Sequence, residues 1–143
     1  MSNSGMAEHV FIILKPDALE RGLVGVLLSR LENKGYLIER LEMTRLDPFR
    51  LRKLYAHIAD KPFYSDVESY MTSGPVVTGA LSGFRVGKGV RQIVGATDPL
   101  RAAPGSIRGD YGRAWEDGNM RNLIHASDSP ENAEREISLW FGA

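Results

Sequence analysis

The spacing of apolar and polar positions along the chain predicts short strands that alternate with amphipathic helices. Apolar runs of mostly branched residues at 10–14 and 76–81 are typical of buried strands. The stretches 36–46 and 122–125 indicate two further strands, the last of them short. Elsewhere apolar residues recur at the spacing of a helix with one buried face. Helices are expected to begin near residues 23, 48, 65, 83 and 130.

The second of these helices has clear start and stop signals. Asp47 offers a side-chain acceptor at the cap, and Pro48 suits the first helical position. The helix is expected to continue through Ile58, because Tyr55 and Ile58 extend its apolar face, and Pro62 ends it.

Capping residues also mark the third and the last helix. Ser65 with Glu68 forms a capping box, and Ser129 caps a helix that ends near Trp140. Between the helices, residues 96–121 show no periodicity and contain several turns with Pro and Gly. A loop of this length inside a compact domain is usually functional.

The order of these elements predicts the fold class. Strand, helix, strand, two helices, strand, helix, strand and helix form an α+β fold of the ferredoxin-like βαββαβ kind. It is a sandwich with a four-stranded antiparallel sheet, and the helices are expected on one face of it. At 143 residues the chain makes one domain by length. We place this domain at residues 9–143, after a flexible N-terminal segment at 1–8.

Composition excludes several classes of partner. Lys and Arg total 18, as do Asp and Glu, so the net charge of zero gives no general attraction to nucleic acid or anionic membranes. Cysteine is absent, which rules out disulfides and thiolate metal sites and agrees with a cytoplasmic location. No apolar run reaches membrane-spanning length. We therefore expect neither a membrane nor a nucleic acid as the main partner.

Familiar phosphate-binding and metal-binding motifs do not fit the chain. Residues 83–89 look like a P-loop but are one residue short, and Gly89 stands where a Ser or Thr would hold magnesium. This stretch is interpreted as the start of an amphipathic helix. The histidines at 9, 57 and 125 are too scattered for ligand spacing, so no metal bound by protein ligands alone is expected.

His125 is the strongest candidate for chemistry. It ends an apolar strand and precedes a polar turn and a helix. A neutral imidazole is a good nucleophile when its other nitrogen donates its proton to an acceptor. Glu131 or Glu136, on the following helix, can serve as that acceptor. At this level a packed histidine at the end of a strand is an equal alternative.

Arginines near the irregular segment favour an anionic substrate for such a histidine. A guanidinium binds phosphate through paired hydrogen bonds. Of these arginines, Arg101 and Arg113 are interpreted as solvated surface charges. The others are Arg91, Arg108 and Arg121.

A series of short motifs follows one order along the chain. They are Lys15-Pro16-Asp17, Arg21-Gly22-Leu23-Val24-Gly25, Lys61-Pro62-Phe63-Tyr64, Ser73-Gly74-Pro75-Val76-Val77, Gly95-Ala96-Thr97-Asp98-Pro99, Pro104-Gly105-Ser106-Ile107-Arg108-Gly109-Asp110, Asn122-x-x-His125-Ala126-Ser127-Asp128 and Glu134-x-Glu136-Ile137. Together they are very specific. On these motifs the chain resembles the nucleoside diphosphate kinases from about Val10 to its end.

The resemblance implies an activity. The chain is expected to transfer the γ-phosphate of ATP, or of another nucleoside triphosphate, to a nucleoside diphosphate. The route implied is ping-pong, through a phosphohistidine on His125 that Glu136 orients. Mg²⁺ is expected as cofactor, held through the nucleotide phosphates. The resemblance also implies a homo-oligomer, either a hexamer or a tetramer.

The same resemblance implies the roles of the other site residues. Lys15 would act near the transferred phosphate and, with Asn122, bind the ribose hydroxyls. Tyr55 would sit beside the histidine, although packing in the core is its ordinary role on an apolar face. Phe63 would stack on the base, which suits any base, although an aromatic at a surface turn is the alternative. The phosphates would be held by Arg91, Thr97 and Arg108.

One segment departs from the family pattern. Between Asp110 and Asn122 the chain is several residues longer than typical members. An apolar residue from this segment holds the base opposite the stacking aromatic in the family, and Trp115 and Met120 are the candidates here. Two other functions are alternatives to the kinase: a regulator that binds nucleotides or nucleic acid without activity, and a histidine phosphotransfer protein. The full set of site residues argues against the first, and Phe63 with the ribose contacts against the second.

Overall fold

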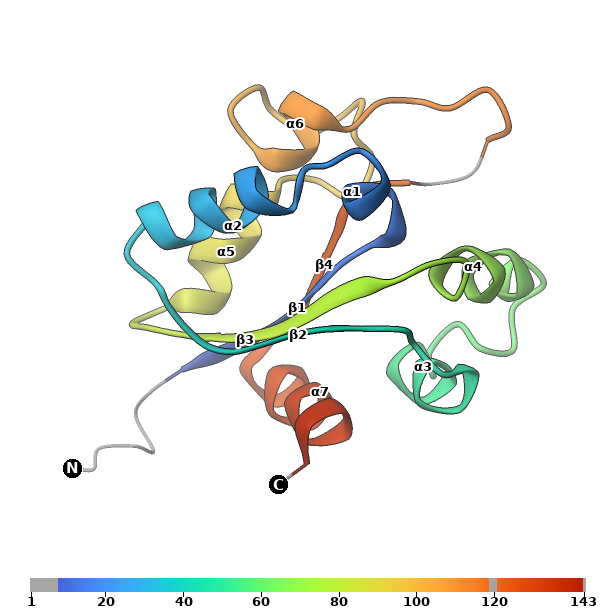
Figure 1. Ribbon diagram of the computed structural model, residues 1–143, viewed down its shortest axis with the longest axis horizontal. Helices are drawn as coiled ribbons and strands as arrows, with labels where there is room; N and C mark the ends of the chain where they lie inside the picture. Colours follow the sequence, from blue (N-terminus) through green and yellow to red (C-terminus); the bar gives the residue numbers. More distant parts are fainter. Residues whose placement is uncertain (1–7, 119–120, 143) are drawn as a thin grey trace.

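The computed structural model describes residues 8–118 and 121–142, which form a four-stranded antiparallel sheet and its covering helices (Figure 1). The strands are β1 (His9–Leu14), β2 (Leu37–Thr44), β3 (Val76–Ser82) and β4 (Ile124–Ala126), in the order β2-β3-β1-β4. The helices are α1 (Pro16–Glu20), α2 (Val24–Asn33), α3 (Pro48–Leu54), α4 (Tyr64–Met71), α5 (Val86–Val94), α6 (Ile107–Tyr111) and α7 (Pro130–Phe141). The predicted ferredoxin-like α+β fold is confirmed.

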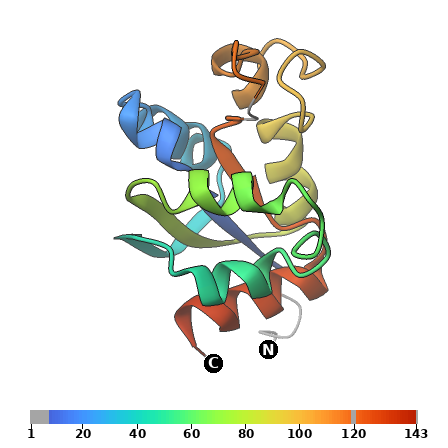
Figure 2. The same cartoon turned by 90° about the vertical axis from the view of Figure 1, so that its right-hand side faces the viewer.

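The central strand β1 buries side chains toward both faces of the sheet. Val10, Ile12 and Leu14 pack into one core cluster with α2 and α5, whereas Phe11 and Ile13 pack into a second cluster with α3 and α7. Figure 2 shows α3 next to α7 under the sheet. The expectation of helices on a single face is therefore wrong. The unbroken apolar run of β1 reflects burial on both sides, since a strand with one solvated face alternates with polar residues.

The first half of α3 agrees with the prediction, but its end does not. The Asp47 carboxylate caps the helix by accepting a hydrogen bond of 2.8 Å from a backbone N–H in the first turn. The predicted extension to Ile58 is wrong, because the helix ends at Leu54 and the chain continues in turns. Tyr55 leaves the helical conformation, and its ring contacts His125.

The predicted capping box of the next helix is absent. α4 begins after Phe63 without a side-chain cap, so Ser65 lies inside the helix. Glu68, the expected partner in the box, instead accepts a hydrogen bond of 3.1 Å from Arg52 of α3. The carboxylate that local spacing predicted to cap α4 therefore binds a side chain of α3 instead.

Two short helices, α1 and α6, have no counterpart in the prediction. α6 lies within the segment 96–121, where the Ser106 hydroxyl caps it by accepting a hydrogen bond of 3.0 Å from the N–H of Gly109. α1 follows Lys15 directly, with Pro16 in its first turn. Each has 5 residues, which is too short for a helical period to show in the sequence.

The P-loop-like stretch 83–89 leads into α5, as its sequence was interpreted. α5 buries Val86, Val90 and Val94 against the sheet. A side chain at Gly89 would meet the hydroxyl of Tyr36 at 1.6 Å. This glycine therefore serves the packing of α5.

Glu8 is the first described residue, and it ties the start of β1 to α5. Its carboxylate accepts a hydrogen bond of 2.9 Å from the N–H of Gly87. The rest of the expected flexible segment, residues 1–7, lies outside the described residues. Within the described ranges, no helix has the length and apolar character needed to cross a membrane.

Candidate active site

β4 carries His125 at its centre and pairs with β1, where His125 lies opposite Ile13. The strand begins later than predicted, because Asn122 and Leu123 form a tight turn before it. Leu123 has a φ of 76°, and the N–H of Ile124 donates to the carbonyl of Asn122 over 2.9 Å, as in a γ-turn. A left-handed backbone is strained at a leucine, and such strain concentrates at functional sites.

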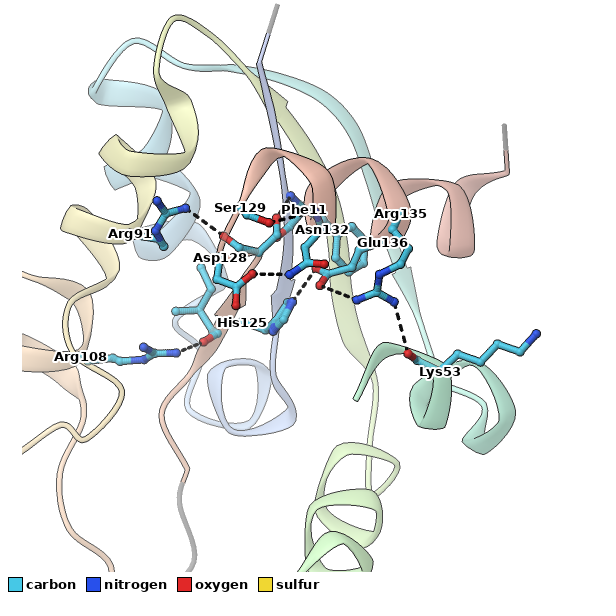
Figure 3. Close-up of polar contacts among 12 residues, drawn as sticks. Phe11, Lys53, Arg91, Arg108, His125, Asp128, Ser129, Asn132, Arg135 and Glu136 are labelled. Carbon is cyan, nitrogen blue, oxygen red and sulfur yellow. Dashed lines mark hydrogen bonds and ion pairs between the residues drawn. The ribbon is translucent and has the colours of Figure 1, made fainter. Parts of the chain in front are cut away.

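Glu136, on α7, contacts the imidazole of His125 (Figure 3). Its Oε1 lies 3.0 Å from Nε2, and only 15% of the histidine side chain and 5% of the glutamate side chain are exposed. A carboxylate acceptor places the proton of the neutral ring on Nε2, so that Nδ1 keeps its lone pair. Of the two acceptors left open by the sequence, Glu136 makes the contact, whereas Glu131 is exposed.

Aromatic rings flank the histidine. The rings of Phe11 and Tyr55 each make an edge contact with His125, at centroid distances of 6.1 and 5.9 Å. Burial raises the pKa of the Tyr55 hydroxyl, and the charge of Glu136 adds to this effect. The phenol therefore stays protonated at neutral pH and remains a hydrogen-bond donor.

Lys15, Asn122 and Thr97 form a chain of hydrogen bonds on the cavity that His125 also lines. The Nζ of Lys15 donates to Oδ1 of Asn122 over 2.6 Å, and Nδ2 of Asn122 donates to the carbonyl of Thr97 over 2.9 Å. Burial of the ammonium group lowers the pKa of Lys15 to about 7, and the charge of Arg108 contributes. An anion that binds here favours the charged lysine.

Arg108 is held by the backbone around the turn. Its guanidinium donates to the carbonyls of Asn122 and Gly95, each over 3.1 Å, and to that of Ile124. A guanidinium has more N–H groups than these acceptors use, so donors remain for a ligand. Burial lowers the pKa of Arg108 to about 10, which leaves it charged at neutral pH. Arg91, from α5, donates to a carbonyl just after β4 over 3.3 Å (Figure 3).

The predicted site residues meet on two neighbouring cavities of about 780 and 430 Å³. Phe63 is 52% exposed and lines the smaller cavity. The other predicted residues all line the larger cavity: Lys15, Tyr55, Arg91, Thr97, Arg108, Asn122, His125 and Glu136. Of these, Lys15, Tyr55, Thr97 and Asn122 line both cavities.

Several residues of the larger cavity have no counterpart in the prediction. They are His57, Asp128, Asn132 and Arg135. Asp128 accepts a hydrogen bond of 2.6 Å from Asn132, which lowers the pKa of Asp128. The sequence held one signal for Asn132, because it precedes Glu136 by four positions and so shares its face of α7.

The long segment before β4 reaches the smaller cavity through Gly118. Trp115, one of the two candidates to cover the base, does not line that cavity. The guanidiniums of Arg113 and Arg121 lie over its ring, at 3.9 and 4.9 Å from the ring centre. Arg113 is exposed, in agreement with its interpretation as a solvated surface charge, and its guanidinium also lies over this aromatic ring. The other candidate, Met120, lies outside the described residues.

Comparison with known proteins identifies a family. The chain matches the family model described as nucleoside diphosphate kinase over residues 8–143. A relative of that name from Streptococcus thermophilus is 49% identical over 94% of this chain and 98% of its own length. Another, from Roseiflexus castenholzii, is 51% identical over 95% of this chain and 89% of its own length.

Solved structures lead to the same family. The nucleoside diphosphate kinase of Encephalitozoon cuniculi superposes with a TM-score of 0.89, is 37% identical, and the match covers 95% of this chain and 90% of that one. The enzyme of Halobacterium salinarum, solved in complex with CDP, gives a TM-score of 0.88 at 42% identity, over 95% and 88%. The chain belongs to the nucleoside diphosphate kinase family of phosphotransferases, which move the γ-phosphoryl group of a nucleoside triphosphate to a nucleoside diphosphate through a phosphohistidine.

Proposed function

We propose that His125 accepts and returns the phosphoryl group in this reaction, with Nδ1 as the attacking atom. The observation that carries this proposal is the 3.0 Å contact between Nε2 and Glu136, which leaves the lone pair on Nδ1. Nδ1 bonds to the γ-phosphorus as the bond to the bridging β–γ oxygen breaks, and a nucleoside diphosphate leaves. A terminal oxygen of the second diphosphate then attacks this phosphorus, and the ring regains its lone pair. One site serves both steps, which gives ping-pong kinetics.

The charge of the transferred group is met by the cations of the larger cavity. Lys15, Arg91 and Arg108 line it together with His125. Phosphoryl transfer needs alignment and neutralisation of charge more than acid–base chemistry. The carbonyls that hold Arg108 support this role, because a guanidinium fixed in advance loses little freedom on binding. Tyr55 offers a protonated hydroxyl beside the histidine, and Thr97 a further contact for the phosphates.

The smaller cavity takes the nucleoside. Phe63 stacks on the base, and Lys15 and Asn122 bind the ribose hydroxyls. The support for this assignment is that Lys15 and Asn122 line both cavities, so they lie where base and phosphates join. A flat aromatic surface accepts every base, which agrees with a broad choice of nucleoside di- and triphosphates.

Mg²⁺ fits this scheme as a companion of the nucleotide. In residues 8–118 and 121–142, no group of three or more His, Cys, Asp or Glu side chains is arranged to hold a metal ion. The acidic residues on the larger cavity, Asp128 and Glu136, are already engaged with Asn132 and His125. The cation would therefore be held by the phosphates, and when bound it neutralises part of their charge.

The assembly proposed for the chain is a homo-oligomer, a hexamer or a tetramer. β2 is an edge strand that carries the exposed apolar residues Leu37, Leu41 and Met43. Such a strand favours burial against another copy, and light scattering distinguishes the two sizes.

A cytoplasmic location is proposed from the absence of cysteine, and cell fractionation tests it.

Incubation with γ-labelled ATP tests the proposal. We expect acid-labile, alkali-stable label on the protein, lost in His125→Ala and discharged by added GDP. His9→Ala is the matched control, because His9 lies away from both cavities and contacts Glu134 at 3.0 Å. A wild-type protein that takes up no label refutes the proposal. Label that GDP does not discharge supports a histidine phosphotransfer protein instead.

A further inference from the structure

Asp17 is a buried carboxylate that lies outside both cavities of the active site. Only 3% of it is exposed, and it follows Lys15 by two positions, in the first turn of α1. Its Oδ1 accepts the hydroxyl hydrogen of Tyr70, and its backbone N–H donates to the same hydroxyl oxygen over 3.4 Å. Its Oδ2 has no hydrogen-bond partner among the described residues. One oxygen is thus anchored, and the other is left to interact with charges at longer range.

A carboxylate at this depth is costly unless positive charge lies near it. Two of the cations that it influences, Lys15 and Arg108, line the active site. Burial and the charge of Arg108 lower the pKa of Lys15, whereas Asp17 raises it. Burial also lowers the pKa of Arg108, and Tyr55 and Asp17 raise it. The carboxylate therefore favours the charged form of both cations without lining either active-site cavity.

Tyr70 connects this carboxylate with the nucleoside side of the site. It lines the smaller cavity with Phe63 and also a separate cavity of about 340 Å³ that Asp17 lines. Burial raises the pKa of Tyr70, and the charge of Asp17 adds to this effect, so the hydroxyl remains a donor at neutral pH. Tyr70 therefore links the Asp17 carboxylate with the cavity that Phe63 and Lys15 line.

We infer that Asp17, anchored by Tyr70, is a positioning residue that increases the fraction of Lys15 that is charged before a nucleotide binds. The inference rests on the role proposed above for Lys15. Asp17 lines neither active-site cavity, so it acts on the substrate only through the lysine.

Other titratable groups surround the pair, and each of them is still present when asparagine replaces Asp17. In the N-terminal half of the chain, the titratable residues that line the two cavities of Lys15 are Tyr55, His57, Asp66 and Tyr70. Those from the C-terminal half are Arg91, Arg108, His125, Asp128, Arg135 and Glu136. Asp17 shares one cavity with Glu20, Asp66, Tyr70 and Arg121. A further cavity adds Arg21, Arg113, Glu116 and Asp117.

The test is the pH dependence of phosphohistidine formation at limiting γ-labelled ATP. In Asp17→Asn we expect the alkaline limb of the profile to move to lower pH by about one unit, because a favourable charge is lost beside Lys15. At low pH, where Lys15 is charged in both proteins, the rates should agree within about twofold. Glu20→Gln is the matched control, since Glu20 is exposed, lies on the same helix and lines the same cavity. Its profile should superpose on that of the wild type.

Tyr70→Phe provides a second variant that keeps the ring and removes only the anchoring hydroxyl. We expect a smaller shift in the same direction, because the released carboxylate can turn away from Lys15. Superposable profiles for wild type and both variants overturn the inference. An equal loss of rate at every pH also overturns it, because that is the signature of structural damage. A wild-type protein that takes up no label refutes the underlying function instead.

Discussion

The imidazole of His125 and the carboxylate of Glu136 face each other across 3.0 Å, so that β4 and α7 meet at the reactive ring. The contact decides which nitrogen carries the proton. It also ties the nucleophile to regular secondary structure on both sides. The orientation of the ring therefore depends on how α7 packs against the sheet.

Glu136→Gln should slow phosphorylation of the histidine. The amide can present its own N–H to Nε2, which moves the ring proton to Nδ1 and removes the lone pair needed for attack. We expect the rate of phosphohistidine formation to fall by roughly a hundredfold or more, as expected when the wrong tautomer is stabilised. Rapid quenching with γ-labelled ATP measures it. Glu131→Gln, exposed on the same helix, should keep the wild-type rate. An undiminished rate in Glu136→Gln would show that the carboxylate does not set the tautomer.

Phe63→Ala should weaken nucleotide binding and leave the chemistry intact. Stacking on an aromatic side chain contributes about 1–3 kcal/mol per base, so the dissociation constant should rise about tenfold or more. Calorimetric titration with ADP measures it, and labelling at saturating ATP should persist. Phe49→Ala is the control, because Phe49 is 70% exposed on α3 and contacts Lys53. Equal affinities of wild type and Phe63→Ala would rule out the stacking role.

ATP binding should take up protons above neutral pH. With a pKa of about 7 in the free protein, Lys15 is partly neutral near pH 7 and increasingly neutral above it. Bound phosphate favours the charged form, so the proton enters with the nucleotide, and affinity falls as pH rises. Calorimetry in buffers of different ionisation enthalpy measures the uptake. Lys15→Arg should lose it, because a guanidinium is charged throughout this range. Equal uptake in the two proteins would assign the proton to another group.

Ser129→Ala should destabilise the fold. The Ser129 hydroxyl accepts a hydrogen bond of 3.1 Å from the N–H of Asn132 and caps α7, the helix that carries Glu136. We expect the free energy of unfolding to fall by about 1 kcal/mol, as measured by denaturant titration. Ser138→Ala, exposed in the same helix, should have little effect or stabilise slightly. An equal loss in both variants would argue against the cap.

Periodicity predicted the long elements of the fold, and tertiary contacts decided where they end. The apolar run of β1 and the caps at Asp47 and Ser129 are local signals, and the structure follows them. α3 ends where Tyr55 contacts His125, a residue far along the chain. Pattern analysis of neighbouring residues cannot detect such a contact.

In the candidate site, too, some residues could be predicted from local signals and others depend on tertiary contacts. His125 and the arginines could be selected from local chemistry, but the choice between Glu131 and Glu136 required the packing of α7. Asp17 and Tyr70 are 53 positions apart, so no spacing rule relates them. Residues that act through another side chain are found only once the chain is folded.

The γ-turn at Leu123 limits where this chain tolerates changes in length. The carbonyl of Asn122 accepts hydrogen bonds from the N–H of Ile124 and from Arg108, and the carbonyl of Leu123 accepts one of 2.8 Å from the backbone N–H of Lys15. The backbone of residues 122–124 thus holds both Lys15 and Arg108 and leads directly into His125. An inserted or deleted residue there would shift His125 relative to both cations at once. Changes in chain length are therefore expected to be tolerated outside this turn and not within it.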